Sequence, residues 1–246
     1  KGSVAEHLCA IPGGRLLAWS KKGDFFVLSG DLSERMVEGS LKEGAGKAGL
    51  FGGIPNQRMV ALDAEVAASW GESTMFGKAP SEVRLWSLDT GEQVGAIPTE
   101  APPAKVLPTP SGDLVVTDRE GWMACLSRDG ERRWRGKVGD KPLAGLLACG
   151  DVLLGWAEGS LRPPMAKIMG DPAIHRVRLS TGEALEPWSE HEASVRQVSA
   201  GGGVVASLDM VGRLRASSLD GEAAVRELPG ASRLQVDAAG RIHVGM

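Results

Sequence analysis

Apolar and polar residues alternate with a period of two along much of the chain, and glycine, proline or aspartate interrupts the alternation at short intervals. The segment VRLWSLDTGEQVGAI (residues 83–97) is representative, with an apolar run, a turn built on Asp-Thr-Gly and a second apolar run. Such a pattern predicts a β-hairpin, because strand side chains alternate between two faces while Gly and Asp favour turns. The pattern as a whole predicts an all-β protein.

The same hairpin returns along the chain. Segments 122–134, 174–188 and 214–228 also centre on a Gly-Glu pair, and the four glycines (Gly91, Gly130, Gly182 and Gly221) are 39, 52 and 39 residues apart. A repeat near 40 residues that consists of strands is typical of the four-stranded blade of a β-propeller.

A second set of hairpins interleaves with the first, at residues 8–20, 50–63, 106–118, 146–158, 198–209 and 234–246. Each unit would take its first two strands, A and B, from this set. Strands C and D would come from the Gly-Glu set and, in the first unit, from residues 24–40. We therefore predict a single β-propeller domain over residues 1–246, with blades near 1–44, 45–100, 101–139, 140–190 and 191–229 and a partial blade at 230–246.

The hairpin count leaves one blade incomplete, with six A–B hairpins against five C–D hairpins. Propellers protect their strand edges by closing the ring of blades. We expect the two missing strands to lie upstream of Lys1; the alternative is an open structure that a partner completes.

The repeats resemble WD40 and quinoprotein-type propeller repeats, loosely and over essentially the whole chain. VRLWSLDTGEQV is similar to the end of a WD40 repeat, with Trp86 at the Trp position, and residues 190–216 resemble its beginning, with His191 at the Gly-His position and Asp209 in the B–C turn. SRDGERRW and STGEALEPW look more like quinoprotein-type repeats. Because Ala216 is taken to occupy the Trp position in the blade that holds His191, the His–Ser/Thr–Trp hydrogen-bond network of WD40 repeats is not expected.

Composition limits the partners. A net charge of −3 gives no basis for nucleic-acid binding, and no apolar run approaches the roughly 18 residues of a membrane span. Cys9, Cys125 and Cys149 are odd in number and form no C-x-x-C pair, which favours free thiols in a reducing compartment. We expect a cytoplasmic protein that binds neither nucleic acid nor membranes.

No motif in the sequence carries recognisable chemistry. EGAGKAG (43–49) lacks the first glycine and the hydroxyl residue of a phosphate loop, and the four histidines are not at metal-ligand spacing. Trp86, Trp134 and Trp188 recur at blade positions, which favours packing between sheets over stacking on a quinone. We predict no cofactor, no metal site, no catalytic residues and no enzymatic activity. The alternative is an enzyme or small-molecule binder with a site in the central funnel, where we expect Ala104, Lys105, Ala144, Gly145, Ser194 and Arg196.

Two segments depart from the repeat, at residues 64–82 and 159–171, and both are predicted as insertions between strands B and C on one face. Exposed apolar clusters in loops indicate recognition surfaces; the alternative is that each insertion folds back onto its own blade. The predicted partner-binding residues are Trp70, Met75, Phe76, Pro163, Pro164, Met165, Ile168 and Met169.

The sequence therefore predicts an interaction scaffold that docks a partner protein or a neighbouring domain of the same polypeptide. The resemblance implies a bacterial module of the kind found beside signalling, ATPase or defence components.

Overall fold

The computed structural model describes residues 5–20, 23–41, 47–48, 56–72, 77–157, 171–189, 191–219, 221 and 223–246. Only strands and turns occur in these ranges, and they contain no helix long and apolar enough to cross a membrane.

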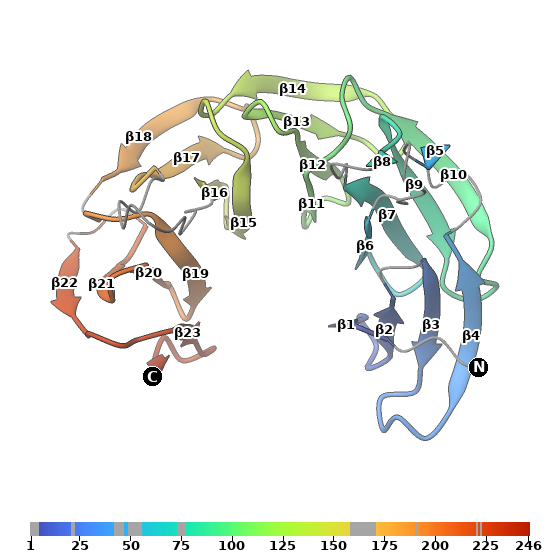
Figure 1. The fold of residues 1–246 in the computed structure, drawn as a ribbon, viewed down its shortest axis with the longest axis horizontal. Helices are drawn as coiled ribbons and strands as arrows, with labels where there is room; N and C mark the ends of the chain where they lie inside the picture. Colours follow the sequence, from blue (N-terminus) through green and yellow to red (C-terminus); the bar gives the residue numbers. More distant parts are fainter. Residues whose placement is uncertain are drawn as a thin grey trace. The chain divides into compact units, whose positions relative to one another are not determined.

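Five four-stranded antiparallel sheets and a final two-stranded sheet follow one another along the chain, and a second two-stranded sheet of very short strands accompanies them (Figure 1). The first three sheets consist of β1 (His7–Ala10), β2 (Leu16–Trp19), β3 (Asp24–Leu28) and β4 (Arg35–Ser40); β6 (Asn56–Ala61), β7 (Val66–Glu72), β9 (Glu82–Ser87) and β10 (Gln93–Pro98); and β11 (Lys105–Pro108), β12 (Leu114–Thr117), β13 (Trp122–Leu126) and β14 (Arg132–Lys137).

The fourth and fifth sheets repeat this order, and the sixth has two strands. They consist of β15 (Leu143–Cys149), β16 (Val152–Ala157), β17 (Ile174–Arg178) and β18 (Ala184–Trp188); β19 (Val195–Gly201), β20 (Val204–Asp209), β21 (Arg213–Ser217) and β22 (Ala224–Glu227); and β23 (Arg233–Val236) with β24 (Ile242–Gly245). Every four-stranded sheet is a meander in which the four strands named here pair in chain order, as the recurring hairpins predict.

The structure divides into two compact units, one formed by Lys1–Asp118 with Ala124–Arg133 and the other by Arg119–Met123 with Trp134–Met246. In the first unit, residues of sheets one and two form one apolar cluster around Phe25 and Trp86, and sheets two and three form another around Trp70 and Leu114. In the second unit, sheets four and five pack around Trp156 and Trp188, and sheets five and six around Leu208 and Leu234. Each core is therefore made by two successive sheets packed face to face.

Within each four-stranded sheet, the second strand is the most buried and the fourth strand is the most exposed. All of β12 is buried, as are all but the first residues of β2, β16 and β20, because a second strand is covered on both faces. The fourth strands are mostly exposed, and all four residues of β22 are. The second strands read as continuous apolar runs for this reason.

Glycines at the predicted turns adopt the conformation that the turn requires. Gly91, Gly130 and Gly182 have φ values of 75°, 85° and 75°, a region that other residues rarely enter. The amide of each donates to the carbonyl of the residue that opens the turn, Ser87, Ser127 and Arg178 respectively. The Gly-Glu segments are C–D turns, as predicted.

The second sheet corrects one predicted hairpin. Residues 50–63 were expected to hold strands A and B, whereas β6 is the first strand and β7, at Val66–Glu72, is the second. The turn lies at Asp63, whose carboxylate accepts the amides of Glu65 and Val66 at 2.7 and 2.8 Å. Part of the predicted 64–82 insertion is therefore a core strand. β5 (Lys47–Ala48) pairs with β8 (Gly77–Lys78) in a separate two-stranded sheet.

Candidate functional site

One predicted partner-binding residue lies in the described part of the chain, and it is buried. Trp70 lies on β7 with 6% of its surface exposed, and its indole N–H points to the carbonyl of Ala104 at 3.4 Å. The expectation that Trp70 is an exposed loop residue is wrong, because the true hairpin places it in a strand. The other predicted residues lie outside the described residues: Met75, Phe76, Pro163, Pro164, Met165, Ile168 and Met169.

Six of the seven tryptophans form two sets of three. Trp86, Trp134 and Trp188 are buried, as the packing interpretation requires. The sequence analysis missed the second set, Trp19, Trp70 and Trp156, each of which lies on the second strand of its sheet. The signal was present as the recurring triplets Leu-Ala-Trp, Ala-Ser-Trp and Leu-Gly-Trp at 17–19, 68–70 and 154–156.

A serine, a histidine and an aspartate meet inside the fifth sheet. His191 Nε2 lies 2.7 Å from Ser207 Oγ, and His191 Nδ1 lies 3.4 Å from Asp209 Oδ2. This order of contacts is that of a catalytic triad. However, the side chains of His191 and Asp209 are fully buried and Ser207 is 1% exposed, so no substrate carbonyl could reach the hydroxyl. The geometry is that of a packed structural network.

Asp209 also fixes the turn that follows β20. Its Oδ1 accepts the amides of Val211 and Arg213 at 3.0 and 2.8 Å. This position in the B–C turn is the one that the WD40 resemblance implies.

Two halves of the His–Ser/Thr–Trp network occur in different sheets. The His–Ser half forms in the fifth sheet, and the Ser–Trp half forms in the second, where the Trp86 indole donates to Ser69 Oγ at 2.7 Å. Ala67 pairs with Trp86 in the second sheet, and the corresponding pair in the fifth is Val205 with Ser217. Ser217 rather than Ala216 therefore occupies the Trp position.

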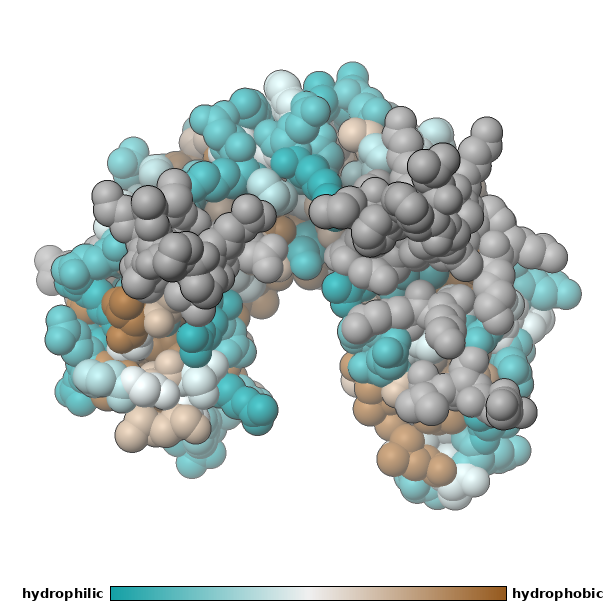
Figure 2. Space-filling model, in the orientation of Figure 1, coloured by the Kyte–Doolittle hydropathy of each residue, from teal (hydrophilic) through white to brown (hydrophobic). Residues whose placement is uncertain are grey.

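Exposed apolar side chains occur on the outer strands β4 and β10 of the first two sheets and in the turn that leads into β4. Leu32, Met36 and Val94 are 62%, 49% and 60% exposed, and we call these three residues the outer-strand patch. Figure 2 shows hydrophobic surface over the first sheet. Met36 and Val94 sit at register shifts of β4 and β10 that leave each without a cross-strand partner. Such bulges turn a side chain away from the sheet.

Leu32 combines exposure with backbone strain. It has a φ of 62°, and its amide donates to Ser29 as Gly130 donates to Ser127 in the third sheet. Leucine therefore stands where other C–D turns have glycine, at a cost of about 1 kcal/mol. Asp31 holds the turn in place, because its Oδ1 accepts from both hydroxyls of Ser29 and Ser33 at 2.7 Å; these bonds lower the pKa of Asp31 to about 2.

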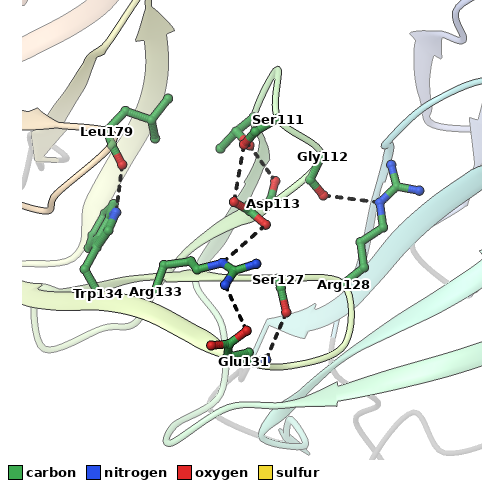
Figure 3. A network of polar contacts seen from close by, with 10 residues as sticks. Ser111, Gly112, Asp113, Ser127, Arg128, Glu131, Arg133, Trp134 and Leu179 are labelled. Atoms are coloured by element: carbon green, nitrogen blue, oxygen red, sulfur yellow. Dashed lines mark hydrogen bonds and ion pairs between the residues drawn. The ribbon is translucent and has the colours of Figure 1, made fainter.

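The arginine-rich segment 128–135 has its charges compensated by neighbouring groups. Arg128 donates to the Gly112 carbonyl, and Arg133 pairs with Glu131 at 2.8 Å (Figure 3). Arg128 also pairs with Asp63 at 2.6 Å. The guanidinium of Arg135 lies over the Trp122 ring. These contacts join turns to one another rather than presenting a basic surface.

The thiols are held in their neutral form. Burial, followed by the Asp113 carboxylate, raises the pKa of the Cys125 thiol to about 11, and burial also raises the pKa of Cys9 and Cys149. Thiolate is the nucleophilic form, so none of the three is activated. Among the described residues no cluster of His, Cys, Asp or Glu has the arrangement of a metal site.

Comparisons with known proteins agree with this architecture. The chain is similar to BamB from Moraxella catarrhalis, with a TM-score of 0.57 and 16% identity over 95% of this chain and 70% of that one. The fold is a β-propeller. A similarity to the computationally designed Ika8 protein gives a TM-score of 0.59 and 13% identity over 90% of this chain, and this chain spans 57% of that protein's length.

These likenesses establish the fold alone, since both identities are below 25%. No family model matches the sequence, and no curated protein matches it either. The described sheets are consistent with about six propeller blades; the single-domain boundaries remain a prediction.

Proposed function

We propose that the chain is a non-enzymatic interaction scaffold that docks a partner protein or another domain of a larger polypeptide. The observation that carries the proposal is Leu32, an exposed leucine in a strained, left-handed turn where the third sheet has glycine. Strained residues cluster at functional sites, where the surrounding structure holds them in place. Asp31 and its serine partners supply that support here.

The outer-strand patch extends this contact surface along two neighbouring sheets. A Cβ at Gly91 would lie 2.6 Å from the Glu38 carbonyl oxygen, so the C–D turn of the second sheet lies directly against β4. Met36 and Val94 therefore belong to adjacent outer strands. Methionine and leucine suit a docking surface, because a few apolar anchors supply most of the binding energy of an interface. The predicted contacts at Met75, Phe76 and residues 163–169, which lie outside the described residues, remain a further, separate prediction.

The substitution Leu32→Gly tests the proposal, because stability and affinity should move in opposite directions. Glycine relieves the strained φ, so the free energy of unfolding should be unchanged or raised by about 0.5 kcal/mol. Loss of the anchor should weaken partner binding about tenfold, the effect of removing one central apolar contact.

The measurement uses the partner recovered by cross-linking from native cells, purified and titrated against each variant. Met36→Ser should also weaken binding, whereas Val225→Ser, an exposed valine on β22, is the matched control and should not. Equal affinity for the wild type, Leu32→Gly and Met36→Ser would overturn the proposal.

A further inference from the structure

The sixth sheet leaves the backbone edge of one strand open. In the five four-stranded sheets, the second strand pairs with the first strand on one edge and with the third strand on the other. In the sixth sheet, the second strand β24 pairs with β23 alone. An unpaired edge presents N–H and C=O groups that another strand can bind.

The open groups of β24 belong to Ile242 and Val244. Leu234, the cross-strand partner of Val244, bonds away from β24, because its amide and its carbonyl both bind the side-chain amide of Gln197, at 3.0 and 2.7 Å. In an antiparallel ladder, two opposite residues either bond each other or both turn their backbone groups away. Val244 therefore turns its N–H and C=O to the open edge, as does Ile242 two residues before it, and no described residue bonds these groups.

The first sheet shows which kind of strand occupies this edge when a sheet is complete. Counted from the A–B turn, Leu16 and Ala18 of β2 correspond to Ile242 and Val244 of β24. Their partners on the third strand β3 are both apolar, Leu28 and Phe26. Ile242 and Val244 are half-buried and pack against the apolar cluster of the fifth and sixth sheets. Apolar side chains opposite them would extend that cluster.

The other face of the sixth sheet is polar. Arg233, Gln235 and His243 lie on it and are exposed. In the first sheet the corresponding face of the second strand is buried, with Leu17 and Trp19 at 0% and 7% exposure. A strand added to β24 would therefore be buried on one face and remain in solvent on the other.

The polar face carries more positive than negative charge. Its acidic neighbour Asp237 is bound by Arg241 at 2.7 Å and lies 3.3 Å from His243. Arg233 forms no hydrogen bond or ion pair with any described residue. A Cβ at Gly245 would lie 3.4 Å from Arg233 Cβ and 3.9 Å from its Cδ, so this side chain extends over β24. Acidic side chains on an added strand would meet an uncompensated guanidinium.

We propose that the β24 edge binds one extended segment of the docked polypeptide as a third, antiparallel strand. The segment has apolar residues opposite Ile242 and Val244 and acidic residues between them. Main-chain hydrogen bonds supply affinity and the alternate side chains supply specificity. The alternation distinguishes this segment from the third strand of a complete sheet, since β3 is buried on both faces, at Phe25 and Phe26. The inference rests on the proposed scaffold function and gives its partner this alternating pattern.

A peptide probe tests the edge with the unmodified protein. The probe is a capped peptide of about eight residues in which valine and glutamate alternate, a length typical of a strand. Amide hydrogen exchange followed by NMR should be fast at Ile242 and Val244 in the free protein and slower at His243, whose amide faces β23. Saturating peptide should slow exchange at Ile242 and Val244 about tenfold, because a paired amide exchanges only when the strand opens. Exchange at Val225, on the outer strand of the fifth sheet, should not change.

Two methylated peptides locate the hydrogen bonds. Residues opposite Ile242 and Val244 turn their own N–H groups to β24, so N-methylation of every valine should abolish the protection. N-methylation of every glutamate blocks only the far edge of the peptide and should leave the protection intact. A peptide of alternating valine and lysine should need about a fivefold higher concentration for the same protection.

A proline substitution tests the same bonds from the side of the protein. Val244→Pro removes an amide that no described residue uses, a change that edge strands tolerate, and should abolish peptide protection at Ile242. Val225→Pro is the matched control and should leave that protection unchanged. Leu228 donates to Gly212, so alternation along β22 turns the Val225 amide outward as well. If Val244→Pro lowers the melting temperature, the methylated peptides decide the question on the wild type.

Three results would overturn the strand site: slow exchange at Ile242 and Val244 in the free protein, no protection by the valine–glutamate peptide, or equal protection by the two methylated peptides. Tighter binding of the lysine peptide would overturn the acidic character of the segment. None of these results bears on Leu32, so the scaffold proposal would stand. Conversely, a partner that ignores the outer-strand patch would overturn the scaffold proposal and leave the peptide result intact.

Discussion

The second and fifth sheets share a buried pair of side chains, a serine on the second strand opposite an arginine on the third. Both have an Ala-Ser pair on the second strand, and in both the serine pairs across the ladder with an arginine of the third strand, Arg84 or Arg215. Both arginines are 2% exposed. Arg84 donates to the Leu41 carbonyl, and the Arg215 guanidinium lies 3.8 Å from the centre of the Trp188 ring. Each arginine therefore reaches the preceding sheet, and Arg84 also pairs with Glu82 at 3.2 Å.

The two sheets differ in how the buried serine is satisfied. Ser69 accepts the Trp86 indole, while Ser207 bonds His191, which in turn faces Asp209. Buried hydroxyls need a partner, and either half of the network supplies one. The comparison teaches that the two halves of this polar network can be divided between sheets, with each sheet keeping the half that satisfies its own serine.

The largest effect should come from His191→Ala. The substitution leaves a cavity, a buried serine without its partner and a buried carboxylate without its imidazole, so the free energy of unfolding should fall by about 3 kcal/mol. Chemical denaturation measures the change, and His243→Ala is the control because that histidine is 61% exposed. A loss below about 1 kcal/mol would mean that the fifth sheet does not depend on its half of the network.

Introducing a tryptophan at position 217 of the fifth sheet, as at position 86 of the second, should destabilise the protein. Ser217 is 7% exposed and accepts a hydrogen bond from Arg215 at 2.7 Å, while the Arg215 guanidinium occupies the face of Trp188. Ser217→Trp would therefore overpack the site and lower the free energy of unfolding by about 2 kcal/mol. Ser217→Ala, which adds no volume, separates lost hydrogen bonding from overpacking. If Ser217→Trp left the free energy of unfolding unchanged, the fifth sheet would have as much space for an indole at this position as the second sheet has.

Most of the fold could be predicted from the sequence, because each hairpin carries its own alternation and turn residues. The second sheet was the exception. Its A–B turn at Asp63 contains neither glycine nor proline, while Ile54-Pro55-Asn56 offered a stronger turn signal about eight residues earlier. Turn chemistry is a local signal and could not show that the true turn is held by an aspartate side chain.

The candidate site was less predictable, because it depends on register and backbone conformation. A one-residue shift in the third strand separates Ala216 from Ser217, and only the cross-strand pairing distinguishes them. Leu32 gave no signal in the sequence, since its φ of 62° and its exposure both follow from the turn that Asp31 builds.

The smallest effect, and the sharpest test of the divided network, concerns Trp86. Trp86→Phe keeps an aromatic ring against Phe25 but removes the indole donor, which leaves Ser69 Oγ buried without its partner. The free energy of unfolding should fall by about 1.5 kcal/mol. Trp70→Phe is the matched control, because the Trp70 indole bond is long at 3.4 Å and its loss should cost about 0.5 kcal/mol.

A double-mutant cycle then isolates the Ser69–Trp86 contact. Ser69→Ala with Trp86→Phe removes both polar groups together, and replacing both partners by apolar groups leaves no unsatisfied atom. The double variant should therefore be about 1 kcal/mol more stable than the sum of the single changes implies. Strict additivity would show that Ser69 finds another partner when Trp86 is removed. In that case the hydroxyl is satisfied independently, and the division of the network between the second and fifth sheets would have no energetic meaning.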